Sequence, residues 1–264
     1  MNLETMTWPD VRDVAQQSVA LLPLGATEQH GRHLAVSTDT AIVTRIAAQV
    51  EANLPEDVVL YPTLAFGSSH HHLDFPGTLS LSPTVFTQVT IDLIQSMVQS
   101  GFRRIMLLNG HGGNITPAKQ ALAIFSQQYK PTVPPWVVLA TYWELAGAPF
   151  AGEPPLESSA LSHACEYETS MMLFLFPDRV RMRAVQRPAP AASPAPIDWD
   201  EDAAARSVSF VMKTQYLSGN GASGQPHLAT MEKGRHLVAQ ATASITTFVT
   251  QFKQWPFLEA RSDA

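Results

Sequence analysis

The chain has 264 residues, of which 45% are hydrophobic and 15% charged, so it can bury a sizeable core and is not disordered by composition. Its 17 basic and 23 acidic residues give a formal net charge of −6, and its basic residues form no cluster larger than pairs such as Arg103-Arg104, which excludes nucleic acid as a partner. No apolar run approaches the roughly 20 residues of a membrane span and Met1 to Asp10 has no secretion-signal pattern, so we expect no membrane partner and a cytoplasmic location.

The first half of the chain alternates short apolar runs with longer amphipathic ones, a pattern typical of a parallel α/β sheet. The first four predicted elements are a strand, a helix, a strand and a helix, at residues 19–24, 40–54, 58–64 and 82–100. The last of these opens with Ser82-Pro83, an N-cap residue followed by proline in the first turn.

The alternation continues through the middle of the chain. The next predicted elements are again a strand, a helix, a strand and a helix, at residues 105–108, 116–129, 136–141 and 162–176. Thr116-Pro117 repeats the signal of a cap followed by proline, and Pro177 stops the last helix.

The C-terminal third is less regular. Residues 187–196 hold four prolines in ten positions and are interpreted as a loop or an extended arm. The chain beyond them is too short for a second domain, and we predict there a helix at 203–216, a glycine-rich loop at 218–227 and a long helix at 230–252. We therefore predict a single α/β domain, residues 1–264, with elaborated loops.

Polar clusters beyond the ends of predicted strands deserve weight, because ligands of open α/β sheets bind there. In the first cluster, Glu28 and His30 are two residues apart in a loop and can point to the same side, and Asp39 can fold back toward them. Two carboxylates and an imidazole suit Zn, Mn or Fe(II), and the single cysteine, Cys165, rules out a Cys-based zinc site. The alternative is that Glu28 and Asp39 are surface or capping residues and His30 is a loop histidine.

The second cluster places His111 among three glycines and two asparagines, directly after a predicted strand. Glycines let the backbone approach a ligand or an ion closely. The alternative, an ordinary turn with an incidental histidine, explains the composition less well.

The third cluster lies in the first turns of the helix predicted at 162–176. His163 and Glu168 are about 140° apart around a regular helix, so both can face one pocket only if the pocket wraps the helix end. The helix dipole favours acids at a helix start, and this explains Glu166 better than Glu168.

Other histidines carry weaker signals. Adjacent side chains point in different directions, so His70, His71 and His72 cannot all bind one ion; they and His33 are candidates for the pocket wall. His227 and His236 have no carboxylate nearby in sequence and are interpreted as structural.

Taken together, residues 27–31, 38–40, 109–114 and 163–170 resemble the motifs of the creatininase (creatinine amidohydrolase) family, and Trp8-Pro9 and residues 75–78 are similar as well. The resemblance implies a three-layer α/β/α sandwich with a mostly parallel central sheet. It also implies two divalent metal ions per chain (Zn, Mn or Fe(II)), hydrolysis of a carbon–nitrogen bond in a cyclic amide or formamide, and a homo-oligomer, often a hexamer.

Carried over residue by residue, the resemblance implies Glu28, Asp39 and His111 on one metal, with His30 and the bridging Asp39 on the other. The creatinine-hydrolysing pattern has an acidic metal ligand two positions after the motif histidine, where this chain has Gly113. Glu168 is the best remaining carboxylate for that second metal. Residues 156–161 also lack a tryptophan that closes over creatinine, although Trp143 can supply an aromatic wall.

The implied chemistry is attack of a hydroxide held between the metals on a carbonyl carbon. Glu168 or His163 carries the proton to the leaving nitrogen, and the N–H groups of Gly112 and Gly113 assist the oxyanion. Within the family, the alternatives are a formamidopyrimidine-type deformylase, a cofactor-precursor peptidase or a hydrolase of another small amide. Outside it, the alternative is a metal-binding module without catalysis.

Overall fold

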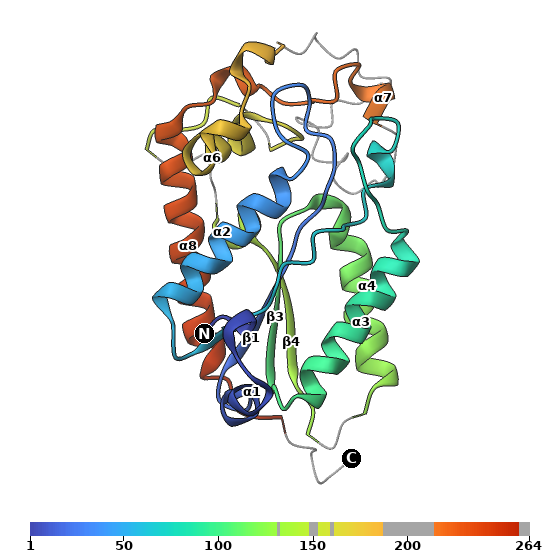
Figure 1. The fold of residues 1–264 in the computed structure, drawn as a ribbon, viewed down its shortest axis with the longest axis vertical. Coiled ribbons are helices and arrows are strands. Elements are labelled where there is room, and N and C mark those ends of the chain that lie inside the picture. Colours follow the sequence, from blue (N-terminus) through green and yellow to red (C-terminus); the bar gives the residue numbers. More distant parts are fainter. Residues whose placement is uncertain (131–132, 148–152, 159–160, 187–213, 259–264) are drawn as a thin grey trace.

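The structure, a computed structural model, describes residues 1–130, 133–147, 153–158, 161–186 and 214–258. Its centre is a parallel sheet with the strand order β2-β1-β3-β4 (Figure 1). The strands are β1 (Val19–Leu24), β2 (Val58–Leu60), β3 (Arg104–Asn109) and β4 (Trp136–Thr141). Strands β1 and β3 pair along their whole length, from Val19 with Arg104 to Leu24 with Asn109.

Helices cover both faces of the sheet and make the three-layer α/β/α sandwich that the resemblance implied (Figure 1). One face carries α3 (Pro83–Gln99) and α4 (Ile115–Gln128). The other carries α2 (Thr38–Asn53), α6 (Glu166–Leu175) and α8 (Met231–Lys253).

The sheet is buried on both faces because successive side chains of a strand point to opposite sides. In β1, Leu21 packs into the core beneath α2 and α8, whereas Leu22 packs into the core beneath α3 and α4. Met106 and Leu107 of β3 divide in the same way. This explains the continuous apolar runs from which the strands were predicted.

Short elements complete the described part of the chain. They include α1 (Trp8–Val14), α5 (Tyr142–Leu145) and α7 (Thr214–Leu217). Single 3₁₀ turns lie at Leu3–Thr5, His70–His72, Gly112–Asn114, Pro177–Arg179, Met182–Ala184 and Pro226–Leu228. Within these described segments, every helix is too short or too polar to cross a bilayer.

The strand order creates a crevice at one edge of the sheet. From β1 the chain goes through α2 to β2 on one side, then returns through α3 to β3 on the other side of β1. Connections therefore leave the neighbouring strands β1 and β3 in opposite directions, and the space beyond their carboxyl ends is where open α/β sheets bind ligands. Both the Glu28 loop and the His111 loop start there.

Most predicted elements are confirmed, with boundary corrections that have physical causes. The strand expected at 58–64 ends at Leu60, since Pro62 cannot donate to a sheet ladder. The helix expected to start at Thr116-Pro117 starts at Ile115, and its N-cap residue is Asn114. Ser82 caps α3 as predicted, accepting a hydrogen bond from the Val85 N–H.

The largest correction concerns the helix predicted at 162–176, because α6 begins only at Glu166. Ala164 has a left-handed φ of +53° and Cys165 is extended, so the helix cannot continue backward through them. His163 therefore precedes the helix. The proline-rich segment 187–196 and most of the helix predicted at 203–216 lie outside the described residues.

Candidate metal centre

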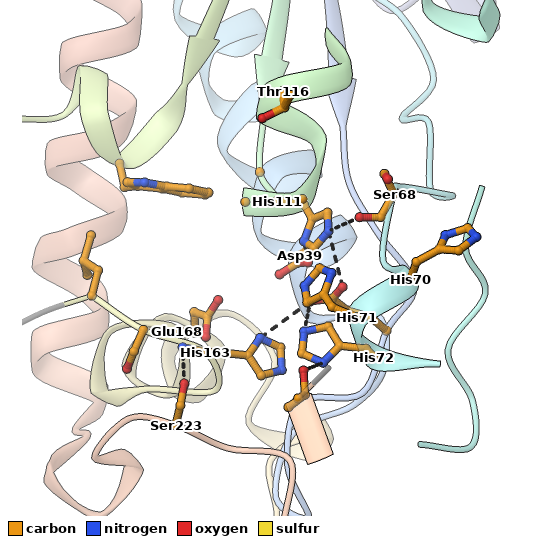
Figure 2. A pocket seen from close by; sticks show the side chains of 18 of the residues that line it. Asp39, Ser68, His70, His71, His72, His111, Thr116, His163, Glu168 and Ser223 are labelled. Atoms are coloured by element: carbon orange, nitrogen blue, oxygen red, sulfur yellow. Dashed lines mark hydrogen bonds and ion pairs between the residues drawn. The ribbon is translucent and has the colours of Figure 1, made fainter. Parts of the chain in front are cut away.

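A cavity of about 740 Å³ lies beyond the carboxyl ends of the strands. Its walls come from the loops after β1, β3 and β4, from residues 68–72 and from the segment that leads into α6. Figure 2 shows the rings of His71, His72, His111 and His163 gathered beside Asp39, whereas His70 points away from them. All three clusters singled out in the sequence thus contribute to one pocket.

The carboxylate of Asp39 lies between two histidines. Its Oδ1 is 3.0 Å from His30 Nε2, and its Oδ2 is 3.0 Å from His111 Nδ1. The other ring nitrogen of His111, Nε2, is 3.3 Å from Glu28 Oε2. Glu168 reaches the same group more loosely, with its Oε1 3.7 Å from His30 Nε2. These five side chains are those for which the sequence predicted metal binding.

Burial makes this arrangement costly without a cation. Glu28, His30, Asp39 and His111 are at most 5% exposed, and buried charges need partners. Five buried side-chain atoms of the described residues have no hydrogen-bond partner, and three belong to this group: Glu28 Oε2, His30 Nε2 and Asp39 Oδ2. Their donors and acceptors are close to one another but not in hydrogen-bonding geometry.

The hydrogen bonding of His30 gives a second reason why a cation fits beside Asp39. Its Nδ1 is 3.2 Å from the backbone carbonyl oxygen of Glu28, which only accepts, so Nδ1 carries the hydrogen. In the neutral ring, the lone pair of Nε2 then faces the carboxylate oxygen of Asp39. Burial opposes a charged His30, but Asp39 and Glu168 outweigh it and raise its pKa well above the ordinary value, so a proton holds this place when no cation is bound. Two electron-rich atoms 3.0 Å apart are repulsive unless a proton or a cation lies between them, so the residues fit a divalent metal ion.

The pKa values of Glu28, His111 and Asp39 are shifted because these groups are buried and lie close together. Burial raises the pKa of Glu28 to about 7. Burial works against a charged His111, but the carboxylates of Glu28 and Asp39 outweigh it and raise the pKa of His111 to about 9. Burial likewise opposes ionisation of Asp39, yet His30 and His111 keep its pKa below the ordinary value. A divalent ion that binds here therefore displaces protons.

Two asparagines fix the loop that carries His111. The amide of Asn109 donates to the His111 carbonyl oxygen at 2.8 Å and accepts from its N–H at 3.2 Å. Asn114 joins three segments, because its Nδ2 donates to the Gly25 carbonyl oxygen and its Oδ1 accepts from the Ser68 N–H. The two asparagines noted in the sequence are thus scaffold residues of the pocket.

Gly113 has no room for a side chain. A Cβ there would overlap the Ser68 carbonyl oxygen and would come within 2.5 Å of His111 Nε2. An acidic residue therefore does not fit this position in the observed backbone, in agreement with the glycine found there.

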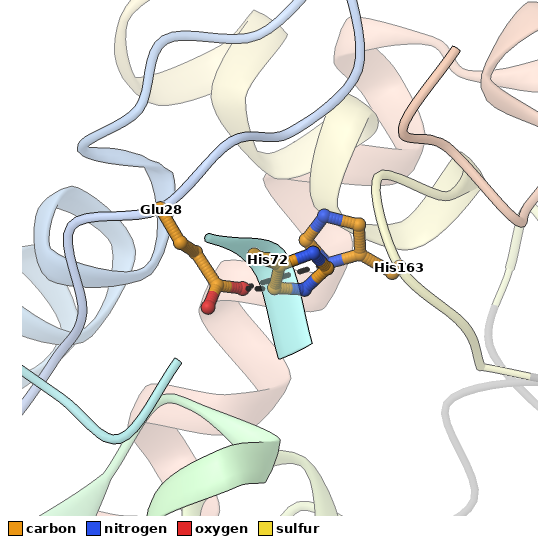
Figure 3. Close-up of side chains that lie close together, drawn as sticks. All are labelled: Glu28, His72 and His163. Atoms are coloured by element: carbon orange, nitrogen blue, oxygen red, sulfur yellow. Dashed lines mark ion pairs between the residues drawn. The ribbon is translucent and has the colours of Figure 1, made fainter. Parts of the chain in front are cut away.

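His72 and His163 stack on one another beside Glu28 (Figure 3), with ring centroids 4.1 Å apart. His163 Nε2 is 2.7 Å from the Gln29 carbonyl oxygen, so Nε2 carries the hydrogen and the free Nδ1 faces Glu28 Oε1 at 3.6 Å. Burial, followed by the charge of His30, lowers the pKa of His163 well below its ordinary value. This histidine is held neutral, with a proton-accepting nitrogen in the pocket.

His72 turns a donor, and not an acceptor, toward Glu28. Its Nδ1 is 2.8 Å from the side-chain amide nitrogen of Gln29 and 2.7 Å from Thr214 Oγ1. The amide orientation of Gln29 is fixed, because its Nε2 donates to Gly221 and its Oε1 accepts from Gly31. Nδ1 of His72 is therefore an acceptor, so Nε2 carries the hydrogen and directs it toward Glu28 Oε1, 3.4 Å away.

Sequence reasoning identified the triplet at 70–72 but could not assign its members. A 3₁₀ turn has three residues per turn, so neighbouring side chains lie about 120° apart and only part of the triplet can face the pocket interior. His70 is exposed and bonded to Ser80, although it borders the cavity. Gln29 was missed, because an amide in a loop gives no distinctive pattern.

The remaining histidines are elsewhere. His33 is buried but is bonded to Thr169 and is not part of the cavity wall, contrary to expectation. His227 and His236 also lie outside that wall.

Glu166 is fully buried and paired with Lys233 at 2.5 Å. Trp143 does line the cavity, as the sequence suggested, together with Tyr142 and Tyr167.

Comparison with known sequences gives a match over nearly the whole chain. The model of the family described as "Creatininase: Creatinine amidohydrolase" matches residues 4–249. A mycofactocin precursor peptide peptidase of Mycobacterium tuberculosis is 30% identical over 247 residues, covering 89% of this chain and 84% of the relative. Creatinine amidohydrolase of Pseudomonas putida is 30% identical over 202 residues (72% and 77%), and 3-dehydro-scyllo-inosose hydrolase of Thermotoga maritima is 30% identical over 181 residues (66% and 56%).

Solved structures of creatininases superpose on this chain. A crystal structure of creatinine amidohydrolase superposes with a TM-score of 0.80 at 26% identity and covers 97% of this chain and 98% of that one. A creatininase variant described as "Zn-Zn type" (TM-score 0.79) and a structure described as "Creatininase Mn" (0.78) each have 25% identity and cover 95% of this chain and 97% of the other.

Proposed function

Since the chain belongs to the creatininase family of hydrolases, we propose that it is a metal-dependent amidohydrolase that cleaves a carbon–nitrogen bond of a small cyclic amide or formamide. The observation that carries this proposal is the set of three buried, unbonded ligand atoms on Glu28, His30 and Asp39. They lie at a cavity of about 740 Å³, which is large enough for a small substrate.

Two divalent ions (Zn, Mn or Fe(II)) fit the donor set. Glu28, Asp39 and His111 would hold one ion, and His30, Asp39 and Glu168 the other, with Asp39 shared. When bound, such ions polarise a carbonyl group and lower the pKa of water. The zinc and manganese forms of the creatininase structures support the first two metals.

The protein's own groups then manage the proton and the substrate. His163 Nδ1 accepts the proton of the attacking water and passes it to the leaving nitrogen, while its Nε2–H stays anchored on the Gln29 carbonyl oxygen. Glu168 is the second candidate for this proton transfer. The backbone N–H groups of Gly112 and Gly113, at the cavity wall, are proposed donors to the oxyanion.

The aromatic wall of Trp143, Tyr142 and Tyr167 suits a flat ring or planar amide. A precursor-peptide peptidase is the second candidate function, favoured by the alignment with the mycobacterial relative, which covers 89% of this chain against 72% for creatinine amidohydrolase. A formamidopyrimidine-type deformylase and a non-catalytic metal-binding module are further alternatives.

A substrate screen tests the proposal. Metal-loaded protein is incubated with creatinine, formamides, short amides and short peptides, and released amine or formate is measured. We expect turnover of an amide or formamide. Cleavage of peptides alone would favour the peptidase, and no turnover with two bound ions would favour the binding module.

The number of bound ions in a ligand variant tests whether the metal ligands are assigned correctly. His30→Ala removes a ligand of one ion, so we expect it to lose one ion and all turnover, as measured by inductively coupled plasma mass spectrometry and by assay. His70→Ala is the control, because that side chain is exposed and points away from the cluster. Full metal content in His30→Ala would overturn the assignment.

We further propose that residues 1–264 form one domain and that the protein acts in the cytoplasm as a homo-oligomer, a hexamer by family resemblance. Light scattering after gel filtration tests the hexamer, which would have six times the chain mass of 28.8 kDa.

A further inference from the structure

We propose that His71 is an additional ligand of the ion that Glu28 and His111 would hold. The proposal rests on the proposed function, because it needs that ion to bind. His71 was predicted only as part of the pocket wall, and the resemblance assigns it no role.

The ring of His71 lies close to two of the proposed ligands. Glu28, His71 and His111 each offer a ligand atom, and these three atoms lie within 4.8 Å of one another, a spacing that one ion can bridge. The rings of His71 and His111 are neighbours, with centroids 6.0 Å apart. Both rings lie on the cavity side of their loops (Figure 2).

The hydrogen bonding of His71 differs from that of its two neighbours. Each neighbour of His71 in the triplet has its ring committed elsewhere: His70 Nδ1 is bonded to Ser80, and His72 Nδ1 to Gln29 and Thr214. Among the described residues, no hydrogen bond or ion pair is made by either ring nitrogen of His71. Its ring is half-buried and lines the cavity, so its nitrogens are available to an ion bound there.

Gly113 lies beside the ring of His71. A Cβ at this position would come 3.1 Å from His71 Cε1, so the His71 ring fills the space beside a backbone that admits no side chain. The carboxylate missing at position 113 belongs to the ion near His30, where Glu168 takes its place, so His71 is an additional donor beside Glu28 and His111. The chain thus provides four side-chain donors for this ion (Glu28, Asp39, His71, His111) and three for the other (His30, Asp39, Glu168).

This count predicts two unequal sites. Four protein ligands are typical of closed, tightly held ions, whereas three leave a position open for water or substrate. We therefore expect the ion near His71 to be the tighter one and the ion near His30 to exchange faster.

The test is a Mn²⁺ titration of metal-depleted full-length protein, with bound ion counted after equilibrium dialysis. His71→Phe keeps a ring of similar shape and removes the donor nitrogens, His71→Glu restores a donor, and His70→Phe is the matched control. We expect His71→Phe to weaken one of two sites by at least the roughly tenfold that loss of even an outer-shell partner costs. His71→Glu should recover most of this affinity, and His70→Phe should match wild type.

A second readout reports direct coordination. Electron spin echo modulation of bound Mn²⁺ detects coordinated imidazole nitrogens, and we expect one fewer in His71→Phe than in wild type. Two wild-type-like sites with unchanged modulation in His71→Phe, alongside loss of one ion in His30→Ala, would overturn this inference and leave the proposed function intact. Failure of the wild-type protein to bind Mn²⁺, Zn²⁺ or Fe²⁺ would overturn both.

Discussion

Two neighbouring glycines, Gly112 and Gly113, meet different surroundings at the edge of the pocket. A Cβ at Gly112 would have no heavy atom within 4 Å, whereas a Cβ at Gly113 would overlap the Ser68 carbonyl oxygen. The first position is open space and the second is a close approach of two backbones.

Alanine substitutions should therefore separate the two positions. We expect Gly113→Ala to destabilise the metal-depleted protein by about 1–3 kcal/mol, because backbone must shift to relieve the overlap. Gly112→Ala is the matched control and should stay within about 0.5 kcal/mol. Urea unfolding of both variants checks this, and equal stabilities would show that the loop relaxes freely.

His163 offers a second prediction at this scale. Because its Nε2–H is anchored on Gln29 and its Nδ1 is free, His163→Gln should lose the proton acceptor without emptying the metal site. We expect kcat to fall by roughly 10²–10⁴-fold, the usual contribution of a general acid–base group. Metal content is measured on the same samples, and a variant that loses an ion would show that His163 is a ligand instead.

Helices α6 and α8 are joined by a buried ion pair. Lys233 of α8 donates to Glu166 of α6 at 2.5 Å, and the Glu166 carboxylate also accepts from Ser158. Burial opposes the charge of Glu166, but these hydrogen bonds outweigh it and keep its pKa below the ordinary value. The pair fixes the helix whose next acidic residue is the proposed ligand Glu168.

Breaking this pair should be expensive. Lys233→Met leaves a buried carboxylate without its cation, so we expect a loss of about 3–5 kcal/mol in the free energy of unfolding at neutral pH. Lys253→Met is the control, because its partner Asp57 is partly exposed and such pairs contribute about 0–1 kcal/mol. Chemical denaturation compares the two; similar losses would mean that Glu166 finds compensation from Ser158 and the backbone.

Elements were predictable from the sequence where local signals and burial agree. The strands at β1 and β4 and the helices α3 and α8 were found within one or two residues, because apolar periodicity and caps mark them. The start of α6 was not, since alanine carries no local signal for the left-handed conformation that Ala164 adopts there. The site residues divide in the same way into predictable and unpredictable ones. Those that come after predicted strands could be found from the sequence: Glu28, His30, Asp39 and His111. The roles of His71 and His72 could not, because they depend on how a 3₁₀ turn is oriented in the fold.

The pocket is assembled from distant parts of the chain. Its proposed ligands lie between Glu28 and Glu168 in the sequence. They come together because the loops that follow several strands border the same crevice beyond β1 and β3. Metal ions bound there would join the layers of the sandwich.

Metal removal should therefore lower the stability of the whole fold. In the absence of ions, Glu28 and Asp39 are buried carboxylates with unbonded oxygens, a costly state. An ion at 100 times its Kd contributes about 2.7 kcal/mol per site through binding to the folded state alone. We expect a chelator to lower Tm and added Zn²⁺ or Mn²⁺ to restore it, as followed by calorimetry. An unchanged Tm would show that the ions, if bound, are weakly held.

Asn114 joins the Gly25 loop, the Ser68 segment and its own loop through one amide group. Gly67 belongs to the same junction, since a Cβ there would come 2.7 Å from Asn114 Oδ1. The three segments are consequently one module for loop grafting. A segment 67–72 taken from a relative with another substrate would keep its shape here only if it preserves the hydrogen bond from the N–H of residue 68 to Asn114 and the close approach of residue 67. Specificity at this pocket is therefore best redesigned by exchanging all three segments together.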